Sequence, residues 1–249
     1  MRAPEHKALT TIRINVARER REDFRKWHNC EHSTDRVMGP GFQVLHRYNA
    51  VDDNDHHDMV VIFEGDSLDA FSSEYYMNSL NSPSPWTRES MKFVKDAERT
   101  VYLLQASCGK EPGFDAPYAY IVRLNANGTP GADRELIAWY EEEHLPRLCG
   151  VPGVLRGRLL KRVDELSSIK TEEQKIQGTG MGECIYMCYL ELDSLENLGT
   201  EVWAKAAFGT PRSAAMRGKL MDLQRERWWL DFTKWTPERK IAAENNHPG

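Results

Sequence analysis

The sequence WHNCEH at residues 27–32, followed by GPGF at residues 39–42, decides the fold of this chain. The same pattern returns 112 positions later, as WYEEEH at residues 139–144 and VPGV at residues 151–154. Trp, Glu, His, Pro and Gly all recur at this one offset without a gap, which unrelated segments would rarely do by chance. The chain is therefore a duplication.

Two shorter repeats flank the long one. IRIN at residues 12–15 corresponds to VRLN at 122–125, at an offset of 110, and DSL at residues 66–68 returns at 193–195, at an offset of 127. The larger offset requires 15 extra residues in the second copy. We expect them in the polar run at residues 164–182, as a surface insertion.

Hydrophobic periodicity predicts the same order of elements, β-α-β-β-α-β, in both copies. We therefore expect a first repeat at residues 8–106, a linker at 107–117, a second repeat at 118–235 with its insertion near 164–182, and a mobile tail at 236–249. The expected strands are 10–16, 42–48, 59–63 and 101–104 in the first repeat, and 120–124, 154–160, 183–192 and 228–232 in the second. Besides the helix that carries the motif, the expected helices are 67–81 and a piece ending at Glu98 in the first repeat, and 195–208 and 216–225 in the second.

Composition excludes several classes of function. The 249 residues include 33 basic and 38 acidic ones, for a net charge of −5, and no stretch clusters Lys and Arg, so nucleic acid is not an expected partner. No apolar run is long enough to cross a bilayer and the N-terminus lacks a secretory signal, so we expect no membrane contact and a cytoplasmic location. The five cysteines show no C-x-x-C spacing, which argues against a disulfide framework or a zinc site.

Tandem β-α-β-β-α-β units that carry W-x-x-x-E-H, and then P-G before the second strand, resemble the dimeric α/β-barrel superfamily, in particular its EthD-like branch. The resemblance covers about residues 8–106 and 118–235. It implies an α+β fold in which two ferredoxin-like repeats form an intramolecular dimeric α/β barrel with helices outside. It also implies a substrate site between each sheet and its own helices. Such relatives include cofactor-independent cyclases, isomerases, dehydratases, lyases and monooxygenases, besides haem-binding branches.

His32 and His144 are the candidates for a general acid or base, because imidazole titrates closest to neutral pH. The alternative is a histidine that ties the helix end to a neighbouring carbonyl. His32 is favoured because its surroundings are more polar. On the second strand of the same repeat, His46 or Tyr48 would bind a developing oxyanion, while strand alternation places Arg47 on the other face. The matching residues 158–160 keep one polar group, which favours the first repeat as the active one.

Glu31 and Glu143 have two interpretations. They could orient the histidines or take the proton themselves, or they could bind a buried arginine such as Arg13 or Arg123. Trp27 and Trp139 are interpreted as core or pocket-wall residues. The remaining residues expected to bind substrate are Phe42, Tyr75 or Tyr76 as pocket walls, and Arg13 or Arg47 as the anchor of a carboxylate or carbonyl.

A metal site has one argument in its favour. His28 and His32 are spaced i, i+4, and Glu31 or His46 could complete a ligand set. Tyr140 replaces His28 in the second copy, and a solvent-facing His28 explains the spacing equally well. We therefore expect no metal.

No cofactor is expected either, because the chain lacks G-x-G-x-x-G, G-x-x-x-x-G-K-[ST] and C-x-x-C-H. The expected partner is a small-molecule substrate, and a homodimer of the chain remains an open alternative to a monomer. The predicted function is a cofactor-independent enzyme of aromatic-derived or polyketide-like metabolism that uses histidine acid–base catalysis, such as an isomerase, cyclase, dehydratase, lyase or lactone-converting enzyme. The alternatives are a cofactor-free monooxygenase and a non-catalytic small-molecule-binding barrel.

Overall fold

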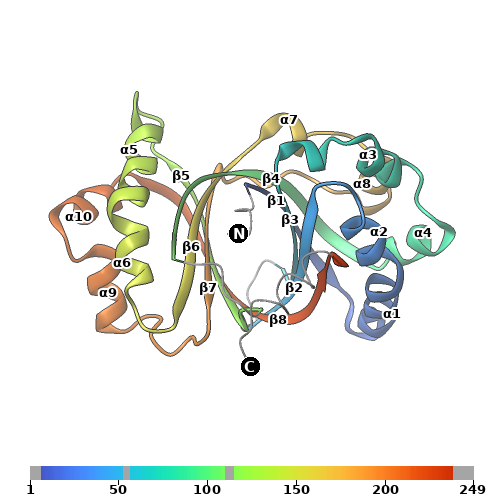
Figure 1. Ribbon diagram of the computed structural model, residues 1–249, viewed down its shortest axis with the longest axis horizontal. Helices are drawn as coiled ribbons and strands as arrows, with labels where there is room; N and C mark the ends of the chain where they lie inside the picture. The colour runs from blue at the N-terminus through green and yellow to red at the C-terminus, as the bar shows by residue number, and fades with distance from the viewer. Residues whose placement is uncertain (1–6, 53–56, 110–114, 238–249) are drawn as a thin grey trace. The chain divides into compact units, whose positions relative to one another are not determined.

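The computed structural model describes residues 7–52, 57–109 and 115–237 (Figure 1). It divides into two compact units. The first comprises Met1–Leu103, Val163–Gly182 and Asp231–Gly249, and the second comprises Leu104–Arg162 and Glu183–Leu230. Residues 238–249 of the tail predicted at 236–249 lie outside the described residues, as do residues 53–56 and 110–114 of two predicted loops.

The first unit contains a four-stranded antiparallel sheet in the order β4-β1-β3-β2. Helices α1 to α4 pack on this sheet and alternate with its strands in the ferredoxin-like order (Figure 1). The strands are β1 (Ala8–Val16), β2 (Phe42–Ala50), β3 (Met59–Gly65) and β4 (Val94–Gly109). The helices are α1 (Arg21–Trp27), α2 (Ser33–Val37), α3 (Glu74–Asn81) and α4 (Pro85–Met91), with a π-helical turn η2 (His28–His32) and 3-10 turns η1 (Arg18–Arg20) and η3 (Leu68–Phe71).

The second unit repeats this order as β8-β5-β7-β6. The strands are β5 (Tyr118–Ala126), β6 (Val154–Arg162), β7 (Tyr186–Leu192) and β8 (Leu220–Trp235). The helices are α5 (Ala132–Trp139), α6 (Leu145–Cys149), α9 (Glu201–Phe208) and α10 (Pro211–Arg217), with a π-helical turn η4 (Tyr140–His144). The eight strands close as a barrel in the order β1-β3-β2-β8-β5-β7-β6-β4, so the predicted α+β barrel is confirmed.

Backbone irregularities recur with the sequence. Asp96 and Asp222 adopt positive φ values of 51° and 53° next to matching β-bulges, at Arg13/Asn15 and Arg123/Asn125 of the paired strands. The repeated P-G also has a conformational reason, because Gly41 and Gly153 have φ of 83° and 90°, a region that side chains disfavour. The duplication thus extends to the turns and bulges.

The structure corrects three predicted elements. Helices expected up to Glu98 and over 216–225 end at Met91 and Arg217, and the long strands β4 and β8 follow them. Pairing with β1 and β5 prevails there over the helix propensity of the charged residues. The expected surface insertion at 164–182 forms α7 (Asp164–Ser167) and α8 (Glu172–Gln177), and it belongs to the first unit rather than to the repeat that contains it in sequence.

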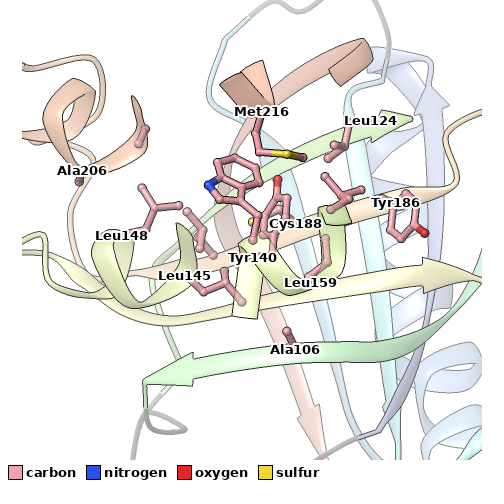
Figure 2. Packing of buried hydrophobic residues seen from close by; sticks show 14 of the residues in the cluster. Ala106, Leu124, Tyr140, Leu145, Leu148, Leu159, Tyr186, Cys188, Ala206 and Met216 are labelled. Carbon is pink, nitrogen blue, oxygen red and sulfur yellow. The ribbon is translucent and has the colours of Figure 1, made fainter. Parts of the chain in front are cut away.

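Each unit has its own apolar core. In the second unit, buried residues from the sheet, α5, α6 and α9 meet around Tyr140 and Cys188, which lie side by side (Figure 2). The first unit has one cluster around Phe42 and Phe71 and another around Trp27. None of the described helices is both long enough and apolar enough to cross a membrane.

Candidate functional site

The repeated Trp and Glu of the motif bind the helix that completes the α/β unit. In the first unit, the indole Nε1 of Trp27 donates to Thr87 Oγ1 at 3.1 Å. Glu31 Oε1 accepts from Thr87 Oγ1 at 2.8 Å and from Ser84 Oγ at 2.6 Å. Ser84 is also the N-cap of α4, since its Oγ accepts from the Thr87 amide. The motif therefore fixes the first helix of the repeat to the start of α4.

The second unit has the same network with Ser and Thr exchanged. Trp139 Nε1 donates to Ser213 Oγ at 3.1 Å, and Glu143 Oε1 accepts from Ser213 Oγ at 2.7 Å. Glu143 also accepts from the hydroxyl of Thr210, the N-cap of α10. These two hydroxyl groups lower the pKa of Glu143, so its carboxylate is ionised and engaged in structure.

The arginines expected to pair with these glutamates lie elsewhere. Arg13 pairs with Glu98 at 3.5 Å, and Arg123 donates to Glu226 at 3.0 Å. Alternation along β1 turns Arg13 away from the helices, because its neighbour Ile14 packs into the core beneath them. The predicted pairing of arginine with the motif carboxylate is therefore wrong.

The motif histidines lie against the motif tryptophans in both units. The π-helical turns η2 and η4 add a residue to the helix between Trp and His, an irregularity that is frequent at functional sites. Ring centroids are 4.5 Å apart for Trp27 and His32 and 4.1 Å apart for Trp139 and His144. Both histidines are thus held by ring contacts on the core side of the helix.

A buried polar cluster surrounds Arg47 in the first unit. The guanidinium donates to Asp231 and to Asn29, each at 2.8 Å, and its Nη1 lies 3.1 Å from His28 Nδ1. Since arginine can only donate, His28 Nδ1 accepts. Burial and the Arg47 charge hold the pKa of His28 well below its usual range. His28 is therefore a buried, neutral imidazole and not the solvent-facing residue considered from the sequence.

His32 lies beside this cluster, with its ring centroid 5.6 Å from that of His28. Burial and the Arg36 charge hold the pKa of His32 well below its usual range. Within the described residues, His32 Nδ1 and His28 Nε2 are buried without a hydrogen-bond partner. The same part of the chain contains no group of three His, Cys, Asp or Glu side chains that could hold a metal ion.

The other first-repeat candidates do not join His32. Arg47 faces the helices, so alternation turns His46 and Tyr48 to the opposite face of the sheet, as the sequence predicts. There the His46 ring lies 6.0 Å from Tyr48, and its Nδ1 is 3.1 Å from Thr233 Oγ1. The sheet backbone separates the two groups, and the expected shared pocket is not formed.

The aromatic residues expected to line the first pocket differ in their exposure. Trp27, Phe42 and Tyr76 are buried in the core of the unit. Tyr75 is 44% exposed and donates its hydroxyl to the carbonyl of Asp35 at 3.0 Å. Of the two neighbouring tyrosines, only Tyr76 thus faces the interior.

A cavity of about 50 Å³ lies between the sheet and the helices of the second unit. Aromatic contacts define its wall: Trp203 meets Tyr120 edge-on at 5.6 Å, and His144 lies 4.8 Å from Tyr140 and 6.1 Å from Phe208. Strands β5, β7 and β8 and helices η4, α6 and α9 contribute to it. The lining residues are Tyr120, Val122, Tyr140, His144, Leu148, Cys188, Leu190, Trp203, Ala207, Phe208, Leu220, Leu223 and Arg225.

His144 is the only described lining residue with a basic nitrogen that is neutral at pH 7. Burial lowers its pKa to about 4, although the Ala207 backbone and the Glu143 charge oppose the shift, and the Arg147 charge adds to it. Its Nδ1 is buried and has no hydrogen-bond partner in the described residues.

The other polar groups of the cavity are protonated at neutral pH. Burial raises the pKa of Tyr140 well above its usual range, and the adjacent Cys188 thiol raises it further (Figure 2). Burial also raises the pKa of Cys188. The pKa of Tyr120 is raised by burial, which prevails over the lowering by the Arg225 guanidinium. Arg225 itself is exposed at the edge of the cavity.

The matching region of the first unit is covered by the segment that carries α7 and α8. Strand register pairs Ile12 with Arg99 and Val122 with Arg225, so Arg99 is the counterpart of Arg225. Arg99 Nη1 donates to the main-chain carbonyl of Leu166 at 2.8 Å. The segment thus supplies the hydrogen-bond acceptor for Arg99.

Further contacts hold the segment in place. Arg36, the counterpart of cavity residue Leu148, forms a buried ion pair with Glu173 of α8. The side chains of Leu166 and Ile176 pack against the two apolar clusters of the first unit. Charge, hydrogen bonding and apolar contacts thus all attach the segment to the first unit.

The sequence-based prediction did not include several residues of the cavity and of the hydrogen-bond network around the motif, although a signal exists for some of them. SPWT at residues 84–87 returns as TPRS at 210–213, and Arg99 returns as Arg225, both at an offset of 126. The first pair identifies the hydroxyl partners of the motif glutamates. Tyr120, Cys188 and Trp203 carry no comparable repeat, because Thr10, Val61 and Tyr76 stand at their counterparts.

No family model and no curated protein matches the chain. Similar solved structures include an anthrone oxidase-like protein, with 11% identity, 96% of this chain and 97% of that chain covered, and a TM-score of 0.58. A candidate monooxygenase from Fusobacterium nucleatum has 9% identity, coverage of 94% and 96%, and a TM-score of 0.60. A mutant chlorite dismutase from Candidatus Nitrospira defluvii has 10% identity, coverage of 97% and 95%, and a TM-score of 0.54. At these identities the likeness concerns the fold alone: the chain has the fold of the dimeric α/β barrels.

Proposed function

We propose that the chain is an enzyme that removes a proton from a small aromatic compound bearing a hydroxyl or carbonyl group. The site is the cavity of the second unit, and His144 is the proton acceptor. The observation that carries this proposal is the position of His144, a neutral imidazole, in the lining of a cavity with aromatic walls. An apolar pocket with a few convergent polar groups is the usual form of a small-molecule site.

The electrostatics support this role. A pKa of about 4 keeps the His144 imidazole neutral and able to accept a proton throughout the neutral range. When the substrate loses its proton, the new enolate or phenolate lies beside the new imidazolium, and the opposite charge raises the pKa of the histidine in the complex. The protonated Tyr140 hydroxyl can donate to the developing oxyanion. Return of the proton to a different atom of the substrate completes an isomerisation, and loss of a leaving group completes an elimination.

Haem, which some branches of the resembling superfamily bind, does not fit this cavity. A volume of about 50 Å³ is too small to enclose a haem macrocycle. One face of the His144 imidazole also lies against Trp139, at 4.1 Å. The cavity suits a single ring or the ring end of a larger molecule, and the proposed chemistry uses the protein's own side chains.

Oxygenation of an activated aromatic compound is a second candidate, favoured by the names of the similar structures, an anthrone oxidase-like protein and two candidate monooxygenases. In that reaction an acidic CH₂ group, deprotonated by His144, would transfer its electrons to O₂. One oxygen atom would become the new carbonyl, and the other would leave as water with the two hydrogens. The substrate would supply all the electrons.

Proton exchange tests the proposal without knowledge of the product. Purified protein would be incubated in D₂O with aromatic ketones that have an acidic CH₂ group, such as 2-tetralone and anthrone, and exchange followed by proton NMR. We expect the protein to accelerate exchange, and His144→Gln to lower the enzymatic rate by about 10²–10⁴-fold. An oxygen electrode on the same samples separates the two candidates, since oxygen uptake occurs only in the second.

The matched control is His32→Gln, which changes the same motif position in the first unit. Its rate should equal that of the wild-type protein. A loss in His32→Gln with normal exchange in His144→Gln would return the site to the first repeat. Equal rates in all three proteins, each folded by circular dichroism, would refute a catalytic role for the motif histidines.

A further inference from the structure

We propose that the substrate of the second-unit cavity carries a carboxylate that binds Arg225. This inference rests on the proposed function and adds a specificity determinant to it. Two independent observations carry it: the chain's own occupation of the matching region in the first unit, and the open hydrogen-bonding capacity of Arg225.

The first unit shows what the position of Arg225 accepts. Its counterpart Arg99 donates to the carbonyl oxygen of Leu166, and the side chain of Leu166 packs into the adjacent apolar cluster. An apolar group followed by an oxygen acceptor therefore fills this region when the chain supplies it. The second unit has the same arginine in register, and no main-chain carbonyl of the described residues accepts from it as that of Leu166 does from Arg99, so a ligand of the same kind can take this place.

Arg225 is equipped for an anion rather than for a neutral carbonyl. A guanidinium has five N–H donors, and the charge of Arg225 lowers the pKa of the neighbouring Tyr120 hydroxyl. Among the described residues, no carboxylate forms an ion pair with it. A planar guanidinium with unused donors matches the two oxygens of a carboxylate.

A second cation strengthens the charge at this edge. The Arg217 guanidinium stacks on the ring of the lining residue Phe208, 5.2 Å from its centroid, and no carboxylate of the described residues pairs with it either. Arg147 adds a third positive charge near His144. The one acidic group that acts on His144, Glu143, is held by two hydroxyls of α10. The local field therefore favours an anionic ligand.

Matched pairs of ligands test the inference. We would measure binding by quenching of tryptophan fluorescence with 4-hydroxybenzoate and its neutral isostere 4-hydroxybenzamide, and with 6-hydroxy-2-naphthoate and its amide. We expect the wild-type protein to bind the carboxylate of at least one pair about tenfold or more tightly than the amide, with the preference falling as salt is added. Arg225→Gln should abolish this preference, because it lowers the affinity for the carboxylate more than the affinity for the amide.

Arg134→Gln is the control, because Arg134 is an exposed arginine of α5 outside the cavity lining; it should behave as wild type. Equal binding of acid and amide by the wild-type protein, or a preference that survives in Arg225→Gln, would overturn the inference and leave the proposed function standing. Failure of every ligand to bind, together with absence of proton exchange, would overturn both. Normal exchange with equal affinities in all variants would overturn the carboxylate inference alone.

Discussion

The two units have nearly the same hydrogen bonds and ring contacts around their motif, and they differ in whether a further segment of the chain covers it. In each, the motif Trp and Glu bind the hydroxyls at the start of the last helix, and the motif His stacks on the Trp. In the first unit the segment with α7 and α8 covers the region that corresponds to the cavity of the second. The two units thus share a scaffold, and the segment with α7 and α8 covers this region in the first unit.

The difference also separates structural from functional roles within one motif. The Trp and Glu do the same work in a covered and in an open unit, so their hydrogen bonds are required by the fold. The residue after Trp is not shared: His28 accepts from Arg47 in the first unit, whereas Tyr140 lines the cavity in the second. The shared Trp and Glu therefore serve the scaffold in both units, and the residue after Trp is where the two motifs differ.

The largest expected effect comes from uncovering the first unit. Glu173→Ala removes the carboxylate that pairs with buried Arg36 and leaves a buried guanidinium without its counter-ion. Breaking such a pair on one side typically costs about 3–5 kcal/mol. We expect the free energy of unfolding, measured by urea titration, to fall by about that amount.

The neighbouring Glu172→Ala is the control for that experiment. Among the described residues, Glu172 forms an ion pair with Lys175 of the same helix at the partly exposed surface, so its loss should leave the urea midpoint nearly unchanged. Equal midpoints for the two variants would mean that the ion pair does not hold the segment, and the contrast between covered and open units would need another cause.

The sequence was sufficient for the fold because the information was periodic. The offsets between repeats, the alternating strands and the P-G turn predict two ferredoxin-like units, and the turn has a local cause in the positive φ of Gly41 and Gly153. The starts of β4 and β8 were not predictable in this way. Their charged residues favour a helix locally, and only pairing with β1 and β5 makes them strands.

The site was only partly predictable. Repetition identified His32 and His144 as equivalent, and alternation placed Arg47 apart from His46 and Tyr48. The choice between the units depends on the segment at 163–182, which packs on the unit that it does not follow in sequence. With few apolar residues among many polar ones, that run carries no periodic signal of burial.

An intermediate effect is expected from acid, because His144 is neutral when folded. Its pKa is about 4 in the folded protein, against about 6.5 unfolded, so the unfolded state takes up the proton first as the pH falls. The contribution of His144 to the free energy of unfolding is fully present above about pH 6.5. About 3 kcal/mol of it is lost as the pH falls from 6.5 to 4. His28 and His32, whose pKa values are also lowered, act in the same direction.

His144→Gln should therefore narrow the stability difference between pH 7 and pH 4 by about 3 kcal/mol, measured by urea titration at each pH. His32→Gln should act in the same direction, since its pKa is lowered by the same cause. An unchanged pH dependence in His144→Gln would show that the imidazole is solvated in the folded state. That result would also remove the electrostatic basis of its proposed role.

The smallest expected effect tests whether the hydrogen bonds of the motif carboxylate stabilise the two units equally. Ser84→Ala and Thr210→Ala each remove an N-cap hydroxyl together with one hydrogen bond to the motif carboxylate. Each should lower the free energy of unfolding by about 1–2 kcal/mol. The two losses should be similar, because both hydroxyls make the same two hydrogen bonds, although Thr210→Ala also removes a methyl group. The double variant should show their sum, since the sites belong to separate units. A loss confined to Ser84→Ala would mean that the covering segment, and not the shared motif, sets the stability of the first unit. A loss confined to Thr210→Ala would mean that the segment with α7 and α8 compensates for the missing cap in the first unit. The stability of that unit would then depend on the segment.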